Sequence, residues 1–181
     1  MNTTAKAILL SIMGVGLATG SALADHIGIY SDAAGTSCLL ELTTPGVPTN
    51  VYIFHKLTPG TIGSRFKVDD TSGVVHVGAS SPYLSIGNPW AGVSIAYGSC
   101  LAGEVNAMTL IYYWFNEPIS CGKLAIVPDP PVADILVTDC NFVEKVATGD
   151  IFYFNPDGNC DCRLPHPVDE SSWGKVKALY R

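Results

Sequence analysis

The chain has 181 residues, of which 48% are hydrophobic and 14% are charged, and its formal net charge is −6. This composition excludes an intrinsically disordered chain, because such chains carry few apolar residues and much charge. The acidic balance and the scattered lysines and arginines also exclude a nucleic-acid-binding protein and an electrostatic membrane binder, which both need clustered basic residues.

The first 24 residues have the features of a secretory signal peptide. Lys6 precedes an apolar run over residues 7–18, and Ala22 and Ala24 are small residues of the kind that a signal peptidase reads. The run is too short for a spanning helix, which needs about 20 apolar residues. We therefore expect residues 1–24 to be removed and residues 25–181 to form one secreted or periplasmic domain, with no membrane insertion of the mature chain.

Short apolar or alternating segments recur along the rest of the chain, and turn-forming residues such as Pro59-Gly60 and Ser72-Gly73 separate them. These segments predict β-strands at residues 27–30, 38–42, 51–56, 65–68, 74–79, 93–97, 108–115, 124–127, 135–138, 143–147 and 151–154. The proline-rich residues 127–132 resemble a linker, but residues 133–181 are too few for a separate core. The pattern predicts a single all-β domain, an immunoglobulin-like or cohesin-like antiparallel β-sandwich.

A short helix is expected at the carboxyl end, over residues 172–180. Acidic and hydroxyl residues from Asp169 to Ser172 can cap it, and Trp173, Val176 and Leu179 then lie on one face. We expect this face to pack on the sandwich, since amphipathic helices usually cover their own core. The alternative is a docking peptide for a partner protein.

The six cysteines all lie in the expected mature chain: Cys38, Cys100, Cys121, Cys140, Cys160 and Cys162. An even number in an exported chain predicts three disulfides. Cys100 and Cys121 flank one predicted strand, and Cys140 and the Cys160-Asp-Cys162 segment flank another. Spacing therefore favours Cys100–Cys121, Cys140 with Cys160 or Cys162, and Cys38 with the cysteine that remains.

A zinc site is the rival interpretation of these residues. It would use four ligands: Cys140, Cys160, Cys162 and His166. The sequence has one Cys-x-Cys and a lone histidine, where zinc sites usually repeat Cys-x-x-Cys or add a histidine pair. An oxidising compartment disfavours free thiols further.

No common catalytic or phosphate-binding motif occurs in the sequence. His55 and His76 lie on different predicted strands, and ordinary surface or hydrogen-bonded histidines are the favoured interpretation. Carboxylates could pair across strands as in glycosidases, but nothing selects a pair among Asp69, Asp70, Glu104, Glu117, Asp139 and Glu144. The sequence thus leans away from an enzyme.

A calcium site is a weaker prediction for the segment after the last predicted strand. Oxygen-bearing side chains stand at every second position: Asn155, Asp157, Asn159 and Asp161. Hard oxygen ligands suit calcium, but the EF-hand glycine and glutamate are replaced by Cys160 and His166. A turn braced by disulfides accounts for the same residues. No other cofactor is predicted.

Two aromatic residues, Tyr83 and Trp90, lie in a proline-rich connection over residues 81–90. Such a connection can present a binding surface that stacks on sugars or contacts a protein. The competing interpretation is that both residues cover the core, because tryptophan is usually well buried.

Four segments resemble those of a group of uncharacterised secreted bacterial proteins. They are Asp25-His-Ile-Gly-Ile-Tyr-Ser-Asp32, Ile95-Ala-Tyr-Gly-Ser-Cys100, Asn155-Pro-Asp-Gly-Asn-Cys-Asp-Cys162 and Ser172-Trp-Gly-Lys-Val-Lys-Ala-Leu-Tyr-Arg181. The resemblance implies a bacterial exported protein that ends in the Trp-Gly helix. It implies no activity and no site.

The favoured function is a secreted noncatalytic binding or interaction module of the bacterial envelope or extracellular space, with a protein or glycan partner. One alternative is a secreted hydrolase whose site is assembled from scattered histidines or carboxylates. Another is a structural subunit of a surface assembly that pairs through sheet edges or the terminal helix.

Overall fold

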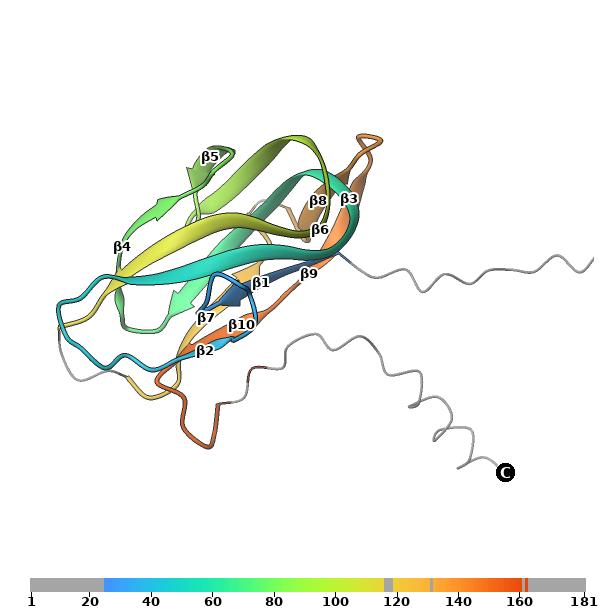
Figure 1. Ribbon diagram of the computed structural model, residues 1–181. Coiled ribbons are helices and arrows are strands. Elements are labelled where there is room, and N and C mark those ends of the chain that lie inside the picture. The colour runs from blue at the N-terminus through green and yellow to red at the C-terminus, as the bar shows by residue number, and fades with distance from the viewer. Residues whose placement is uncertain (1–24, 116–118, 131, 161, 163–181) are drawn as a thin grey trace, which may run out of the picture.

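The computed structural model describes residues 25–115, 119–130, 132–160 and 162 (Figure 1). These residues form ten strands and no helix: β1 (His26–Tyr30), β2 (Leu39–Leu40), β3 (Thr49–Thr71), β4 (Val75–Ser80), β5 (Leu84–Asn88), β6 (Gly92–Tyr113), β7 (Gly122–Val127), β8 (Ile135–Asp139), β9 (Glu144–Gly149) and β10 (Ile151–Phe154). The helix expected over residues 172–180 lies outside the described residues. Within them, no helix has the length and apolar character needed to cross a membrane.

The all-β prediction is confirmed, but two pairs of predicted strands are each one long strand. β3 joins predicted strands 51–56 and 65–68, and β6 joins 93–97 and 108–115. Pro59-Gly60 bends β3 instead of ending it. Leu57 and Gly60 take positive φ angles of 58° and 153°, and pairing with β6 continues past them with register shifts. Such irregularities bend a strand without breaking its ladder.

The paired bend of β3 and β6 builds the two layers of the fold (Figure 1). The first half of β3 lies between β1 and the second half of β6, and β4 extends that layer. The second half of β3 pairs with the first half of β6, with β8 and with β7, and β5 extends this layer beside β6. The ends of β6, far apart in sequence, therefore face each other across the core.

The expected antiparallel arrangement holds for most pairs but not for all. β1 runs parallel to β9, with His26 opposite Thr148, and β10 runs parallel to β2. Because β1 also pairs with β3, its contact with β9 links the layers at one edge. At the opposite edge, β4 and β5 pair only with β6 among the described strands. That edge is open.

The core lies between the layers and follows the alternation of the strands. Val51 and Ile53 of one half of β3 and Phe66 and Val68 of the other half are all buried. Burying side chains of this size stabilises the fold by about 1.5–3 kcal/mol each. Strands β8, β9 and β10 follow the proline-rich residues 127–132, yet they pair with β1, β3 and β7. The chain on both sides of that segment thus shares one pair of layers.

The cysteines form three disulfides, Cys38–Cys162, Cys100–Cys140 and Cys121–Cys160. The predicted bond from Cys38 to the Cys160–Cys162 segment is confirmed, and the other two predicted pairings are wrong. The zinc alternative is wrong as well, because its three cysteines belong to three different disulfides.

The bend of β3 and β6 explains the corrected pairing. Cys100 lies at the bend of β6, where β3 pairs with β8, and Cys140 directly follows β8. A side-chain carbon on Gly60 would lie only 2.8 Å from the sulfur of Cys140, so the bend packs directly against this disulfide. Cys121 and Cys160 flank β7 and β10, which are neighbours in the second layer.

Candidate functional site

One face of the second layer carries two cross-strand rows of outward-pointing residues. The first row is Ile86, Ser94, Arg65, Leu136 and Val146, on β5, β6, β3, β8 and β9 in turn. The second row is Leu84, Ala96, Gly63, Thr138 and Glu144. Paired residues of a sheet point to the same side, so these ten residues form one surface, the outer face.

The outer face has exposed apolar side chains and two charged residues, Arg65 and Glu144. Leu84 and Ile86 are each 69% exposed and Val146 is 61% exposed, while Leu136 is half-buried. Between them stand small residues such as Ser94 and Ala96. In the second row the small residues Ala96 and Gly63 follow Leu84, whereas in the first row Arg65 of the middle strand β3 lies between Ser94 and Leu136. The exposed apolar residues of this face favour its burial against another surface.

The positive charge of Arg65, at the centre of the first row, is paired with the carboxylate of Asp129. The Nε atom of Arg65 donates a hydrogen bond to Oδ2 of Asp129 over 2.6 Å, and that carboxylate is nearly buried. Gly92 makes this possible, because a side-chain carbon there would lie 1.8 Å from Oδ1 of Asp129. Arg65 is thus held by a paired carboxylate.

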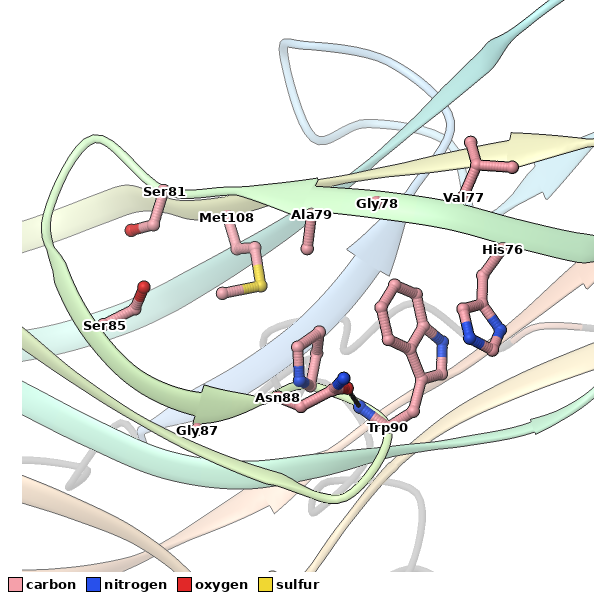
Figure 2. A pocket seen from close by; sticks show the side chains of 11 residues that line it. His76, Val77, Gly78, Ala79, Ser81, Ser85, Gly87, Asn88, Trp90 and Met108 are labelled. Atoms are coloured by element: carbon pink, nitrogen blue, oxygen red, sulfur yellow. Dashed lines mark hydrogen bonds between the residues drawn. The ribbon is translucent and has the colours of Figure 1, made fainter.

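A pocket of about 360 Å³ opens between β4 and β5, behind the outer face. Trp90, directly before β6, stacks on His76 of β4 with 3.9 Å between ring centres and 19° between ring planes. Figure 2 shows Trp90 between His76 on one side and the space bordered by Ala79, Ser81, Ser85 and Met108 on the other. A second hollow of about 500 Å³ lies on the far side of the stack and is lined by Lys67, Asp69 and Asp70.

The two aromatic residues singled out in the sequence have different environments. Trp90 lines both hollows, and its Nε1 donates to the hydroxyl of Tyr112 over 3.2 Å. Tyr83 is half-buried and meets the ring of Tyr97 edge-on at 4.9 Å, against the core. β5 runs between these two residues. The sequence pattern did not predict this strand because prolines and turn residues surround it, although the alternation of Leu84 and Ile86 is typical of a strand.

A buried polar chain is the feature that sequence reasoning did not find. His55 is fully buried, and its Nε2 lies 3.1 Å from Oδ1 of Asp25. Its Nδ1 lies 3.5 Å from the hydroxyl of Tyr97, which in turn lies 2.8 Å from the hydroxyl of Ser64. Burial lowers the pKa of His55, although Asp25 opposes this shift. Burial also raises the pKa of Tyr97.

A second histidine and carboxylate lie beside this chain. Nε2 of His26 is 3.4 Å from Oδ2 of Asp150, and Nδ1 of His26 is 3.0 Å from the hydroxyl of Thr148. Both histidine–carboxylate contacts connect the β1 region with neighbouring strands. They lie under the edge that β1 and β9 close, where they connect the strands of this edge.

The structure does not bring together His55 and His76. His55 belongs to the buried chain, whereas His76 is exposed and stacks on Trp90. Among the candidate carboxylates, Asp69 and Asp70 both line the second hollow, where Oδ2 of Asp70 lies 3.9 Å from Nδ1 of His76, and the other described ones lie apart from them. Oε1 of Glu104 lies 3.2 Å from Nζ of Lys56, and Oδ2 of Asp139 lies 2.9 Å from Nζ of Lys145. Glu117 lies outside the described residues.

The predicted calcium segment forms a turn braced by the Cys121–Cys160 disulfide. Oδ1 of Asn155 accepts a hydrogen bond from the backbone N–H of Leu42 over 2.8 Å, and Oδ1 of Asp157 accepts one from Asn159 over 2.7 Å. Asp157 also bonds the hydroxyl of Ser120. Asp161 lies outside the described residues. The side-chain oxygens of Asn155 and Asp157 thus already hold the turn, and calcium binding stays a prediction.

Comparisons with known proteins identify the fold. The chain matches a non-cellulosomal cohesin from the hyperthermophilic archaeon Archaeoglobus fulgidus with a TM-score of 0.50 and 12% identity, over 72% of this chain and 91% of that one. The chain has a cohesin-like fold. A cohesin module of a Clostridium perfringens family 33 glycoside hydrolase matches with a TM-score of 0.47 and 8% identity, over 75% and 99% of the two chains. No family model and no curated protein matches the sequence.

This result confirms the prediction of a β-sandwich in its cohesin-like form. At 12% identity the likeness concerns the fold alone, because one fold hosts many functions. In this cohesin-like chain, the outer face and the β4–β5 pocket are the surfaces with features beyond those that the fold itself needs.

Proposed function

We propose that this protein is an exported module that binds a protein partner through the outer face. The carrying observation is the row Ile86, Ser94, Arg65, Leu136 and Val146, which crosses five strands, places exposed apolar side chains on its two outer strands and half-buried Leu136 between them, and pairs its one charge with Asp129. Contiguous exposed apolar surface of this kind marks interaction sites on soluble proteins. Depletion of charge at the centre is typical of protein interfaces.

The breadth of this face, which spans five strands, favours a protein over a small ligand as the occupant. Small molecules bind in concave sites that enclose most of their surface, whereas protein interfaces are broad and close to planar. The cohesin-like fold is compatible with this use but does not by itself carry it. Export is supported by the three disulfides, which form and persist in oxidising compartments.

The proposal is tested by binding of the oxidised protein to envelope and culture-fluid proteins of its source, followed by crosslinking and measurement of affinity for the captured partner. A double variant, Ile86→Asp with Val146→Asp, places two charges on the outer face without touching the core. We expect it to weaken binding at least a hundredfold, because a desolvated unpaired charge opposes association.

Val75→Asp is the matched control. Val75 is 55% exposed on β4, which belongs to the first layer and carries none of the residues of the two rows. This variant is expected to bind as the unchanged protein does. Equal binding by the double variant and the unchanged protein would refute the outer face as the site. Sedimentation at increasing concentration separates a partner-binding monomer from a subunit that assembles with itself.

A further inference from the structure

We propose that the β4–β5 pocket binds a neutral sugar ring, with Trp90 as the stacking platform. This site is independent of the outer face, because adjacent residues of β5 point to opposite sides. Leu84 and Ile86 belong to the outer face, whereas Ser85 and Gly87 line the pocket.

The position of the pocket follows from the bend of β6. β5 pairs with the beginning of β6, and β4 pairs with its end. Since the bend brings these two ends across from each other, β4 and β5 face one another without pairing. The edge of the sandwich stays open at this point, and the volume of about 360 Å³ is at the small end of the range of ligand pockets, roughly 300–1,000 Å³. That size suits one ring with its substituents.

The indole of Trp90 is held in place before any ligand arrives. Its backbone N–H donates to Oδ1 of Asn88 over 2.9 Å, and its Nε1 donates to the hydroxyl of Tyr112 over 3.2 Å. His76 covers one face of the ring, so the opposite face borders the pocket (Figure 2). An aromatic ring held in this way loses little entropy on binding and offers a flat apolar surface.

The rest of the lining combines an apolar floor with polar groups at the rim. Met108 is buried at the floor, and Ala79 lies beside it. The hydroxyl of Ser85 has no hydrogen-bond partner in the part of the chain that the structure describes. Asn88 uses its side-chain oxygen for Trp90, which leaves its amide N–H groups for a ligand.

This set of groups selects the chemical class of the ligand. A pyranose has a ring face of C–H groups that packs on an aromatic plane and an edge of hydroxyls that bond to serine and amide groups. His76 is the one titratable side chain among the pocket's lining residues, and its Nδ1 already lies 3.9 Å from Oδ2 of Asp70, so these residues offer no unpaired charge to a charged ligand. Acidic sugars and nucleotides would therefore lose hydration without gaining an ion pair.

The test is titration of the oxidised full chain with glucose, galactose, mannose, N-acetylglucosamine and their short oligomers, at millimolar concentrations. Binding is measured by the indole and amide signals in two-dimensional NMR, with glucuronic acid and AMP as charged probes. We expect at least one neutral sugar to shift the Trp90 indole and the Ser85 and Asn88 signals. A free monosaccharide and the end of a glycan chain are distinguished by whether the oligomers bind as tightly as the monomer.

Two variants test the pocket directly. Trp90→Ala removes the platform, and Ser85→Phe fills the pocket from an exposed position that leaves the core intact. Both are expected to weaken sugar binding at least tenfold, and Ser85→Phe keeps the test valid should Trp90→Ala unfold. Ile86→Ser, one residue further along β5, is the control and retains sugar binding. The proposal is overturned when no neutral sugar shifts these signals, when only the charged probes do, or when Ser85→Phe binds undiminished.

Discussion

Nε2 of His55 lies 3.1 Å from Oδ1 of Asp25, and both side chains are buried beneath the edge that β1 and β9 close. The simplest proton arrangement has His55 neutral, with its Nε2–H donating to Asp25 and its Nδ1 accepting from the hydroxyl of Tyr97. Removing one partner of such a pair costs more than the pair contributes, because the other polar group stays buried and unpaired.

The buried His55 makes stability depend on pH. Burial holds the pKa of His55 below its ordinary value of 6.5, so the unfolded chain binds this proton more tightly than the folded one. The contribution of His55 is therefore fully present above about pH 6.5 and is lost progressively as the pH falls below that value. We expect urea denaturation to show a falling free energy of unfolding between pH 7 and pH 5.

Paired histidine variants assign this effect. His55→Asn removes the titrating group, and its stability should change less between pH 7 and pH 5 than that of the unchanged protein, although it is lower throughout. His76→Asn alters an exposed histidine and should leave the pH profile unchanged. A His55→Asn profile as steep as the original would contradict the assignment.

The disulfides should contribute unequally to stability. Cys38–Cys162 spans 124 residues and Cys100–Cys140 spans 40. The loop-entropy relation gives about 5 and about 4 kcal/mol for the two loops. We expect Cys38→Ser with Cys162→Ser to lower the thermal midpoint somewhat more than Cys100→Ser with Cys140→Ser. Mass spectrometry of unreduced digests checks the pairing, and a Cys100–Cys121 peptide would contradict it.

Gly92→Ala should destabilise the junction of β5 and β6 and disturb the outer face. The added carbon would lie 1.8 Å from Oδ1 of Asp129, so this carboxylate must move away from Arg65. Gly98→Ala is the control, because Gly98 also has a positive φ angle but no atom within 4 Å of the added carbon. In denaturation experiments, the free energy of unfolding should fall by about 1–3 kcal/mol more for Gly92→Ala than for Gly98→Ala. Equal losses would mean that backbone strain alone is responsible.

Tyr112→Phe should loosen Trp90. The variant removes the hydroxyl that accepts from the indole Nε1, at a cost of about 0.5–1.5 kcal/mol in the free energy of unfolding. The Trp90 indole signal should shift in NMR, since the ring loses its side-chain hydrogen bond while it keeps its stacking on His76 and its edge-on contact with the ring at position 112. An unchanged indole signal would show that this hydrogen bond does not hold the ring.

Local pattern predicted most strands correctly because alternation depends only on neighbours along the chain. Val51 and Ile53 face the core, as their spacing requires, and so do Ile135 and Val137. β5 was missed because Gly87 and Asn88 within it and Pro82 and Pro89 around it are turn formers. Its pairing with β6 outweighs their local preference.

The candidate sites were predicted less well, because they join residues that are distant in the sequence. Trp90 was singled out for its type, but its partner His76 belongs to β4 and meets it only across the two layers. The row from Ile86 to Val146 crosses five strands, and no sequence spacing records which strand lies beside which.

The sequence by itself determined the all-β class, the inward and outward faces of most strands and the oxidation of an even set of cysteines, since each depends on composition or local period. Only the tertiary structure decided which cysteines pair, that β3 and β6 bend together, and that Asp25 meets His55. The physical reason is that the bend near Gly60 reverses both strands at once. It thereby selects the neighbours of every residue beyond it.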